Sequence, residues 1–159
     1  MQNKQINWCF GIKDGLRLIE PNERLAKLYI QEAKTSLKTA ENNLKNGDLL
    51  WTTVVVYYAE YYALYSFLQK IGIKCENHAC SILATSYILG NDKTEIINLH
   101  KEKRIDAQYY MKIDKKDEVS NMLQKAKTFV LMFDEIVSNL NEKEINLYKE
   151  RIQKVKDTP

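Results

Sequence analysis

The stretch from Leu49 to Leu68 constrains the fold more than any other part of the chain. It holds twenty mostly apolar residues with one charge, Glu60, and it lies between a residue that can cap a helix, Asp48, and one that can end it, Gly72. A run of this length could cross a bilayer. However, Glu60 and five tyrosines lie in its interior, whereas a membrane helix carries its aromatic residues at its ends. We therefore expect a helix buried among other helices and no membrane span.

The rest of the chain also favours long helices. Only five glycines and two prolines occur in 159 residues, which argues against a turn-rich β fold. Hydrophobic residues make up 45% of the chain, enough for one core, and the net charge of +3 neither requires nor excludes a nucleic-acid partner.

Hydrophobic periodicity places the other helices. Apolar residues at steps of three and four predict a helix over 25–44 that ends at Asn46-Gly47. Further helices are expected over 76–89 and from 92 or 94 to 111. Another should begin at a cap on Asp114 or Asp117 and continue to 140. Asn141 with Glu144 resembles a capping box for a last helix. We predict one all-α domain whose core, over 22–140, is an up-and-down antiparallel bundle of four to five helices. An arm at 1–21, anchored by its aromatic residues, should precede the core, and a helix at 141–159 should follow it.

The cysteines and the first twenty residues bear on the compartment. Cys9, Cys75 and Cys80 are an odd number without repeated spacing, so we expect no disulfide scaffold and small buried thiols in a reducing cytosol. The start of the chain lacks the continuous apolar core of a secretory signal. The sequence therefore predicts a cytoplasmic protein.

Catalytic and metal-binding signatures are scarce. On a helix Cys75 and His78 would share a face, but Cys80 would point about 140° away, and no second pair of ligands follows. We expect neither a metal nor a cofactor, and we place His78 in the first turn of a helix. Glycine-rich phosphate loops and nucleophile elbows are also missing.

Five tyrosines of the central helix fall within an arc of about 140°: Tyr57, Tyr58, Tyr61, Tyr62 and Tyr65. Such a stripe could line a cleft in which hydroxyls bind phosphate or ribose and rings stack on bases. Core packing explains the same stripe, and we expect it for most of the five.

Arg104 is the most informative single residue. On the expected helix it shares a face with Ile96, His100, Ala107 and Met111, and Lys103 lies at the edge of that face. The guanidinium should therefore sit in or beside the core, where it requires a specific partner. That partner is either a phosphate, or a structural one such as a carboxylate or the tyrosines.

The central stretch is similar to the HEPN superfamily of small helical prokaryotic proteins. The resemblance rests on Trp51, on the segment from Val54 to Gly72, on His78, and on the segment from Arg104 to Tyr109, and it covers about residues 22–140. It implies a helical bundle that dimerises, with a cleft near the dimer interface. Ribonucleolytic relatives use an Arg followed, after about four to six residues, by a His that transfers a proton, without metal. Arg104 matches the Arg, but Tyr109, Tyr110 and Met111 stand where the His is expected.

Three hypotheses follow. The leading one is a homodimer that binds RNA, a nucleotide or a protein partner, as one component of a toxin-antitoxin or defence pair beside a minimal nucleotidyltransferase. In it, Arg104 holds a phosphate, and Tyr58, Tyr62 and Tyr109 border the cleft. The second is a metal-independent endoribonuclease in which His100 or His78 acts with Arg104. The third is a structural interaction module without catalytic activity, which predicts Arg104 paired with a carboxylate of its own subunit.

Overall fold

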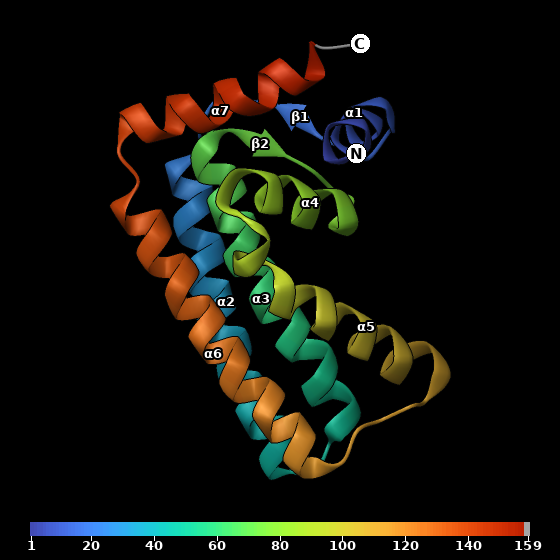
Figure 1. Ribbon diagram of the computed structural model, residues 1–159. Helices are drawn as coiled ribbons and strands as arrows, with labels where there is room; N and C mark the ends of the chain where they lie inside the picture. Colours follow the sequence, from blue (N-terminus) through green and yellow to red (C-terminus); the bar gives the residue numbers. More distant parts are fainter. Residues whose placement is uncertain (158–159) are drawn as a thin grey trace.

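The computed structural model describes residues 1–157, and within them the chain is almost entirely helical (Figure 1). Seven α-helices follow one another: α1 (Gln2–Gly11), α2 (Glu23–Lys45), α3 (Leu49–Ile71), α4 (His78–Leu89), α5 (Glu95–Tyr110), α6 (Lys116–Asn139) and α7 (Glu142–Lys156). A short 3-10 helix, η1 (Asn91–Lys93), joins α4 to α5. The two-residue strands β1 (Arg17–Leu18) and β2 (Ile73–Lys74) pair antiparallel. The predicted all-α class is confirmed, although the periodicity gave no sign of the strand pair.

Helix α3 is the centre of the bundle. It contacts α2, α6, α5, α4 and α7. The chain direction alternates between α2, α3, α5 and α6, whereas α4 lies crosswise to the long helices (Figure 1). Small side chains on α3, among them Ala59, Ala63 and Ser66, are fully buried. The Ser66 hydroxyl donates a 2.7 Å hydrogen bond to the carbonyl of Ala26 on α2, which is possible because the two helices approach closely. None of the helices in residues 1–157 is long and apolar enough to cross a membrane.

Side-chain caps set most of the helix starts. Asp48 accepts a hydrogen bond from the amide of Trp51, and Asn141 forms a reciprocal capping box with Glu144, both as predicted. Helix α4 begins at His78 rather than at residue 76, because the Asn77 side chain caps it. Neither Asp114 nor Asp117 caps α6: the helix follows Lys115, whose amide donates to the Glu118 carboxylate.

Gly72 ends α3 in a left-handed conformation, with φ of 85°. A Cβ at this position would lie 2.5 Å from the carbonyl oxygen of Ile19, so the strand pair and the arm can pass close to the end of α3 only beside a glycine. This close approach, together with the hydrogen bond from the Ile19 amide to the Gly72 carbonyl, holds the chain at Ile19 and Pro21 against the end of α3.

The arm contains a helix, α1, that packs against α4 and α7. Its buried residues are Ile6 and Cys9, whereas Trp8 is 60% exposed, so the expectation that its aromatic residues anchor it is wrong for Trp8. At the other end of the chain, α7 lies across the top of the bundle in Figure 1. The last two residues of the expected helix at 141–159 lie outside the described part of the chain.

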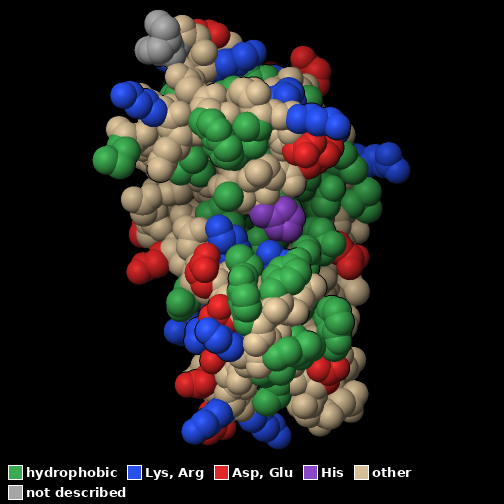
Figure 2. Space-filling view, turned by 90° about the vertical axis from the view of Figure 1, so that its right-hand side faces the viewer, with side chains coloured by type: hydrophobic (Ala, Val, Ile, Leu, Met, Phe, Trp, Pro, Cys, Tyr) green, Lys and Arg blue, Asp and Glu red, His purple; other side chains and the backbone are tan. Residues whose placement is uncertain are grey.

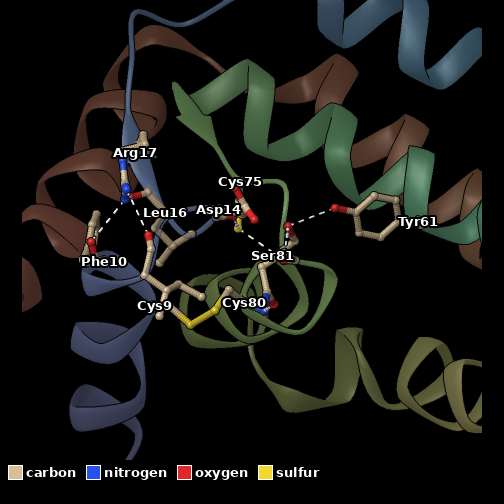
Figure 3. The surroundings of a disulfide bond; sticks show 11 residues. Cys9, Phe10, Asp14, Leu16, Arg17, Tyr61, Cys75, Cys80 and Ser81 are labelled. Atoms are coloured by element: carbon tan, nitrogen blue, oxygen red, sulfur yellow. Dashed lines mark hydrogen bonds between the residues drawn. A yellow bond between two sulfur atoms is a disulfide. The ribbon is translucent and has the colours of Figure 1, made fainter.

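A disulfide joins Cys9 of α1 to Cys80 of α4 (Figure 3). The prediction of three reduced cysteines is therefore wrong for these two, and the cysteine count no longer argues for a reducing cytosol. The two residues are 71 positions apart, and only the packing of α1 on α4 brings them together. Cys75 is a buried free thiol, as expected.

Candidate functional site

Helix α5 crosses α3 and places Arg104 on two tyrosine rings. The guanidinium carbon lies 4.8 Å from the ring centroid of Tyr57 and 5.8 Å from that of Tyr58. Arg104 Nη1 donates to the side-chain oxygen of Gln108 at 3.2 Å, one helical turn further on. Within residues 1–157 no carboxylate pairs with Arg104, and its buried Nε has no hydrogen-bond partner. The carboxylate that the structural-module hypothesis requires is therefore missing, while the stacking on tyrosines left open by the sequence is present.

His78, the first residue of α4, faces the same tyrosines. Its Nδ1 lies 2.8 Å from the Tyr57 hydroxyl oxygen, and its ring stacks on Tyr61 with the centroids 3.8 Å apart. The imidazole is half-buried. Figure 2 shows a histidine in a depression on this face of the molecule, with basic side chains beside it. The His78 ring also lies 5.9 Å from the ring centroids of Tyr57 and Tyr58, so His78 and Arg104, from different helices, meet at the same pair of tyrosines.

The electrostatics of this cluster keep the imidazole neutral. Burial lowers the pKa of His78 from its ordinary value of 6.5, and the positive charges of Arg104 and Lys101 lower it further. Burial also raises the pKa of Tyr57, so its phenol stays protonated and can either donate to His78 Nδ1 or accept from it. A neutral imidazole is the form that can accept a proton.

Lys101 belongs to this cluster, whereas Lys103, which the sequence places at the edge of the Arg104 face, does not. Lys103 points elsewhere and pairs with Asp114 at 2.9 Å. Lys101 precedes Arg104 by three residues, so the two side chains share one side of α5, and both act on the pKa of His78. The spacing was visible in the sequence, but nothing in it showed which side of α5 faces His78. We call His78, Arg104, Lys101, Tyr57 and Tyr58 the Arg104 site.

His100, the other histidine considered for catalysis, lies in the core. Its side chain is 1% exposed, and its Nδ1 lies 2.6 Å from the carboxylate of Glu60, which is fully buried on α3. Burial raises the pKa of Glu60 to about 7, although the hydrogen bond and charge of His100 oppose that rise. The ring faces α3 and is not accessible to a substrate.

The other predicted site residues are spread along the molecule. The ring centroid of Tyr62 lies 6.2 Å from that of Tyr58. However, Tyr62 stacks on Tyr29 of α2, with the ring centroids 5.9 Å apart, and not on Arg104. Tyr109 is 66% exposed, and five residues after Arg104 it points about 140° away on the helix. Met111 does not share the Arg104 face as predicted, because α5 ends at Tyr110 and Met111 adopts a left-handed conformation in solvent.

The remaining tyrosines of the stripe belong to the core. Tyr57, Tyr61 and Tyr65 are all buried, which confirms the packing interpretation for most of the stripe. The hydroxyl of Tyr61 lies 3.1 Å from Ser81 Oγ, and that of Tyr65 accepts from the amide of Cys75. The described residues contain no group of three or more His, Cys, Asp or Glu side chains placed to hold a metal ion.

A family model for the HEPN domain matches residues 26–136, from the first turn of α2 almost to the end of α6. The chain belongs to the HEPN family. The Arg104 site lies entirely within the matched HEPN domain, whereas α1 and α7 lie outside it. No curated protein and no solved structure matches this HEPN chain.

Proposed function

We propose that this HEPN protein binds RNA and that Arg104 holds one of its phosphates. The observation that supports the proposal most is a half-buried guanidinium that has no carboxylate partner among residues 1–157 and whose buried Nε is unpaired there. A partly desolvated cation of this kind is only partly compensated by tyrosine rings. A phosphate oxygen would supply both the missing negative charge and the missing acceptor.

The neighbours of Arg104 suit the same ligand. Lys101 adds a second positive charge, and Tyr58 is the half-exposed ring beside the guanidinium. Exposed aromatic rings stack on unpaired bases, and they do so with little regard to sequence. We therefore expect single-stranded RNA to bind better than a duplex.

Binding of a fluorescent single-stranded RNA, followed by anisotropy, tests this assignment. Arg104→Ala should weaken binding by about tenfold or more, because a charge-assisted contact to phosphate is lost. Arg151→Ala is a matched control, since Arg151 also lies on a tyrosine, 5.5 Å from the ring centroid of Tyr87, but outside the Arg104 site. Equal affinities for the wild type and Arg104→Ala would refute the assignment.

A second candidate function, a metal-independent endoribonuclease, is favoured by the position of His78. With Nδ1 donating to Tyr57, the free Nε2 of the neutral ring could take the proton of a ribose 2′-hydroxyl. The oxygen would then attack the adjacent phosphorus, Arg104 would stabilise the charge on the phosphate, and a proton from water would reach the departing 5′-oxygen. The products would be a 2′,3′-cyclic phosphate and a 5′-hydroxyl.

Incubation of single-stranded RNA with the protein in a chelator separates the two functions. If the enzyme hypothesis is correct, His78→Ala abolishes cleavage and leaves RNA binding largely intact. If cleavage stops with His100→Ala but survives His78→Ala, the assignment of the proton acceptor is wrong. Binding without cleavage at any protein concentration would leave the RNA-binding function alone.

We also propose that the protein works as a homodimer beside a minimal nucleotidyltransferase, in a toxin-antitoxin or defence pair. Membership of the HEPN family supports this, and so do four neighbouring exposed apolar side chains at the end of α5, namely Tyr109, Tyr110, Met111 and Ile113. Sedimentation of the purified protein gives the oligomeric state. A neighbouring nucleotidyltransferase gene, whose product copurifies with this chain, would support the pairing, and a monomer at micromolar concentration would exclude the dimer.

A further inference from the structure

A pocket of about 420 Å³ lies between α1, α4 and the segment from η1 to α5. Trp8 of α1 and Leu83 of α4 give it apolar walls. Gln5, Asn91 and Asn98 add three amide side chains, and Lys101 lies at its edge toward the Arg104 site. Its volume is within the range of roughly 300 to 1,000 Å³ that is usual for small-molecule sites.

The polar groups of the pocket are available for a ligand. The Asn91 side-chain oxygen accepts a hydrogen bond from Ser86, which leaves its amide nitrogen free to donate. The side chains of Gln5 and Asn98 are exposed, so their amide groups are open to a ligand. Each amide offers both donors and an acceptor, which match the edge of a nucleobase.

Trp8 supplies the stacking surface. It is 60% exposed, although it is flanked in sequence by Cys9, which the disulfide fixes to Cys80 of α4. Both of these cysteines also line the pocket, so a covalent link holds the Trp8 wall against α4. An exposed indole held in this way can stack on a base at a small cost in conformational entropy.

The pocket and the Arg104 site share one residue, Lys101. Lys101 lines the pocket and also lowers the pKa of His78, and Ala79 of the pocket wall follows His78 directly in the chain. A nucleotide whose base lies against Trp8 would therefore have Lys101, one helical turn before Arg104, at the same pocket to meet its phosphate. Helix α1 lies outside residues 26–136, so this wall is an addition of the present chain to the HEPN domain.

We propose that this pocket binds one unpaired base of the RNA whose phosphate Arg104 holds. The proposal rests on the proposed RNA-binding function and adds a base subsite to it. Stacking on Trp8 would provide most of the affinity of this subsite, and the amides of Asn91 and Asn98 would contact the edge of the base.

Fluorescence detects the base directly. Trp51, the only other tryptophan, lies at the start of α3, at the opposite end of the bundle from α1 in Figure 1. In a Trp51→Phe variant, adenosine monophosphate and short single-stranded RNA should quench Trp8 in a saturable way, whereas ribose 5-phosphate, which lacks the base, should not. Quenching by ribose phosphate, or none by any probe, would overturn the proposal.

Affinity measurements separate the subsite from the phosphate site. Trp8→Ala should weaken RNA binding about tenfold, within the range for loss of one stacked base. Trp51→Ala is the matched control, because Trp51 is similarly exposed, at 49%, and should have no effect. Asn98→Leu, an exposed substitution that does not disturb the α1 packing, should weaken binding in the same direction.

The outcomes for the two sites are distinguishable. If Arg104→Ala weakens binding and both Trp8→Ala and Asn98→Leu leave it unchanged, the base subsite is refuted and the proposed function stands. If Trp8→Ala weakens binding and Arg104→Ala does not, the base pocket stands and the phosphate assignment fails. A further test uses a set of RNA strands that each lack one base, at a different position in each strand. If every strand in the set binds as tightly as the intact RNA, the base subsite is refuted.

Discussion

The two histidines of this chain are held in similar ways and have opposite surroundings. Each ring binds through Nδ1 to a residue of α3: His78 to Tyr57, at 2.8 Å, and His100 to Glu60, at 2.6 Å. Tyr57 and Glu60 are three residues apart, so α3 presents both partners on one side. His100 and its partner are fully buried, whereas His78 is half-buried beside two positive charges.

This difference separates a structural pair from a candidate reactive group. The buried imidazole and the Oε1 atom of the Glu60 carboxyl bind each other and are closed to solvent, which ties α5 to α3. The His78 ring has a neutral partner, faces a depression, and lies beside Arg104, which pairs with no carboxylate in the described part of the chain. The burial and the partner of each imidazole, rather than its distance from Arg104 along the sequence, decide which one could act on RNA.

The largest effect is expected from His100→Ala. The substitution leaves the Glu60 carboxyl in the core without its partner, and breaking such a buried pair costs on the order of 3 kcal/mol in the free energy of unfolding. Urea denaturation of the wild type and the variant at pH 8 measures this loss of stability. His78→Ala, the matched change, should cost about 1 kcal/mol, the usual value of one hydrogen bond. Equal losses for the two variants would contradict the division into a structural and an accessible histidine.

The buried pair should also make stability depend on pH. Burial raises the pKa of Glu60 from 4.5 to about 7, so between these values the folded protein holds a proton that the unfolded chain releases. The stabilisation from this proton is complete below pH 4.5 and is lost as the pH rises through 7, by at most about 3 kcal/mol.

Comparison of the wild type with Glu60→Gln isolates this contribution, because glutamine keeps the shape and the hydrogen-bonding capacity but not the titration. The free energy of unfolding of the wild type, relative to the variant, should fall between pH 4.5 and 7. A parallel pH dependence of the two proteins would show that the Glu60 carboxyl does not keep its proton in the folded state.

The helices could be predicted from the sequence because they rest on local physics. Periodicity and caps such as Asp48 and Asn141 placed helix ends correctly, and Arg104 stood out as a charge on an apolar face. The site could be predicted only in part. His78 and Arg104 come from different helices, and no spacing shows that both lie on Tyr57. The disulfide between Cys9 and Cys80 depends on the same long-range packing.

A smaller effect is expected from Tyr57→Phe. The variant removes the hydroxyl that binds His78 Nδ1 but keeps the ring under Arg104, so we expect a loss of about 1 kcal/mol in the free energy of unfolding. RNA affinity should stay within about twofold, because the phosphate contact is retained. A loss as large as that of His100→Ala would mean that the Tyr57–His78 contact is a structural pair too.

The smallest effect concerns the pKa of His78, which NMR of the imidazole protons measures. Burial is the largest cause of its lowering and Arg104 the next, so Arg104→Ala should raise the pKa by only part of the shift. Lys101→Ala should raise it less, since Lys101 contributes less than Arg104. Lys103→Ala, whose charge is paired with Asp114, should leave it unchanged. If removing Arg104 does not move the pKa of His78, the two side chains are not electrostatically coupled. The contrast between His78 and His100 would then give no support to a shared site in which Arg104 binds phosphate and His78 takes the proton.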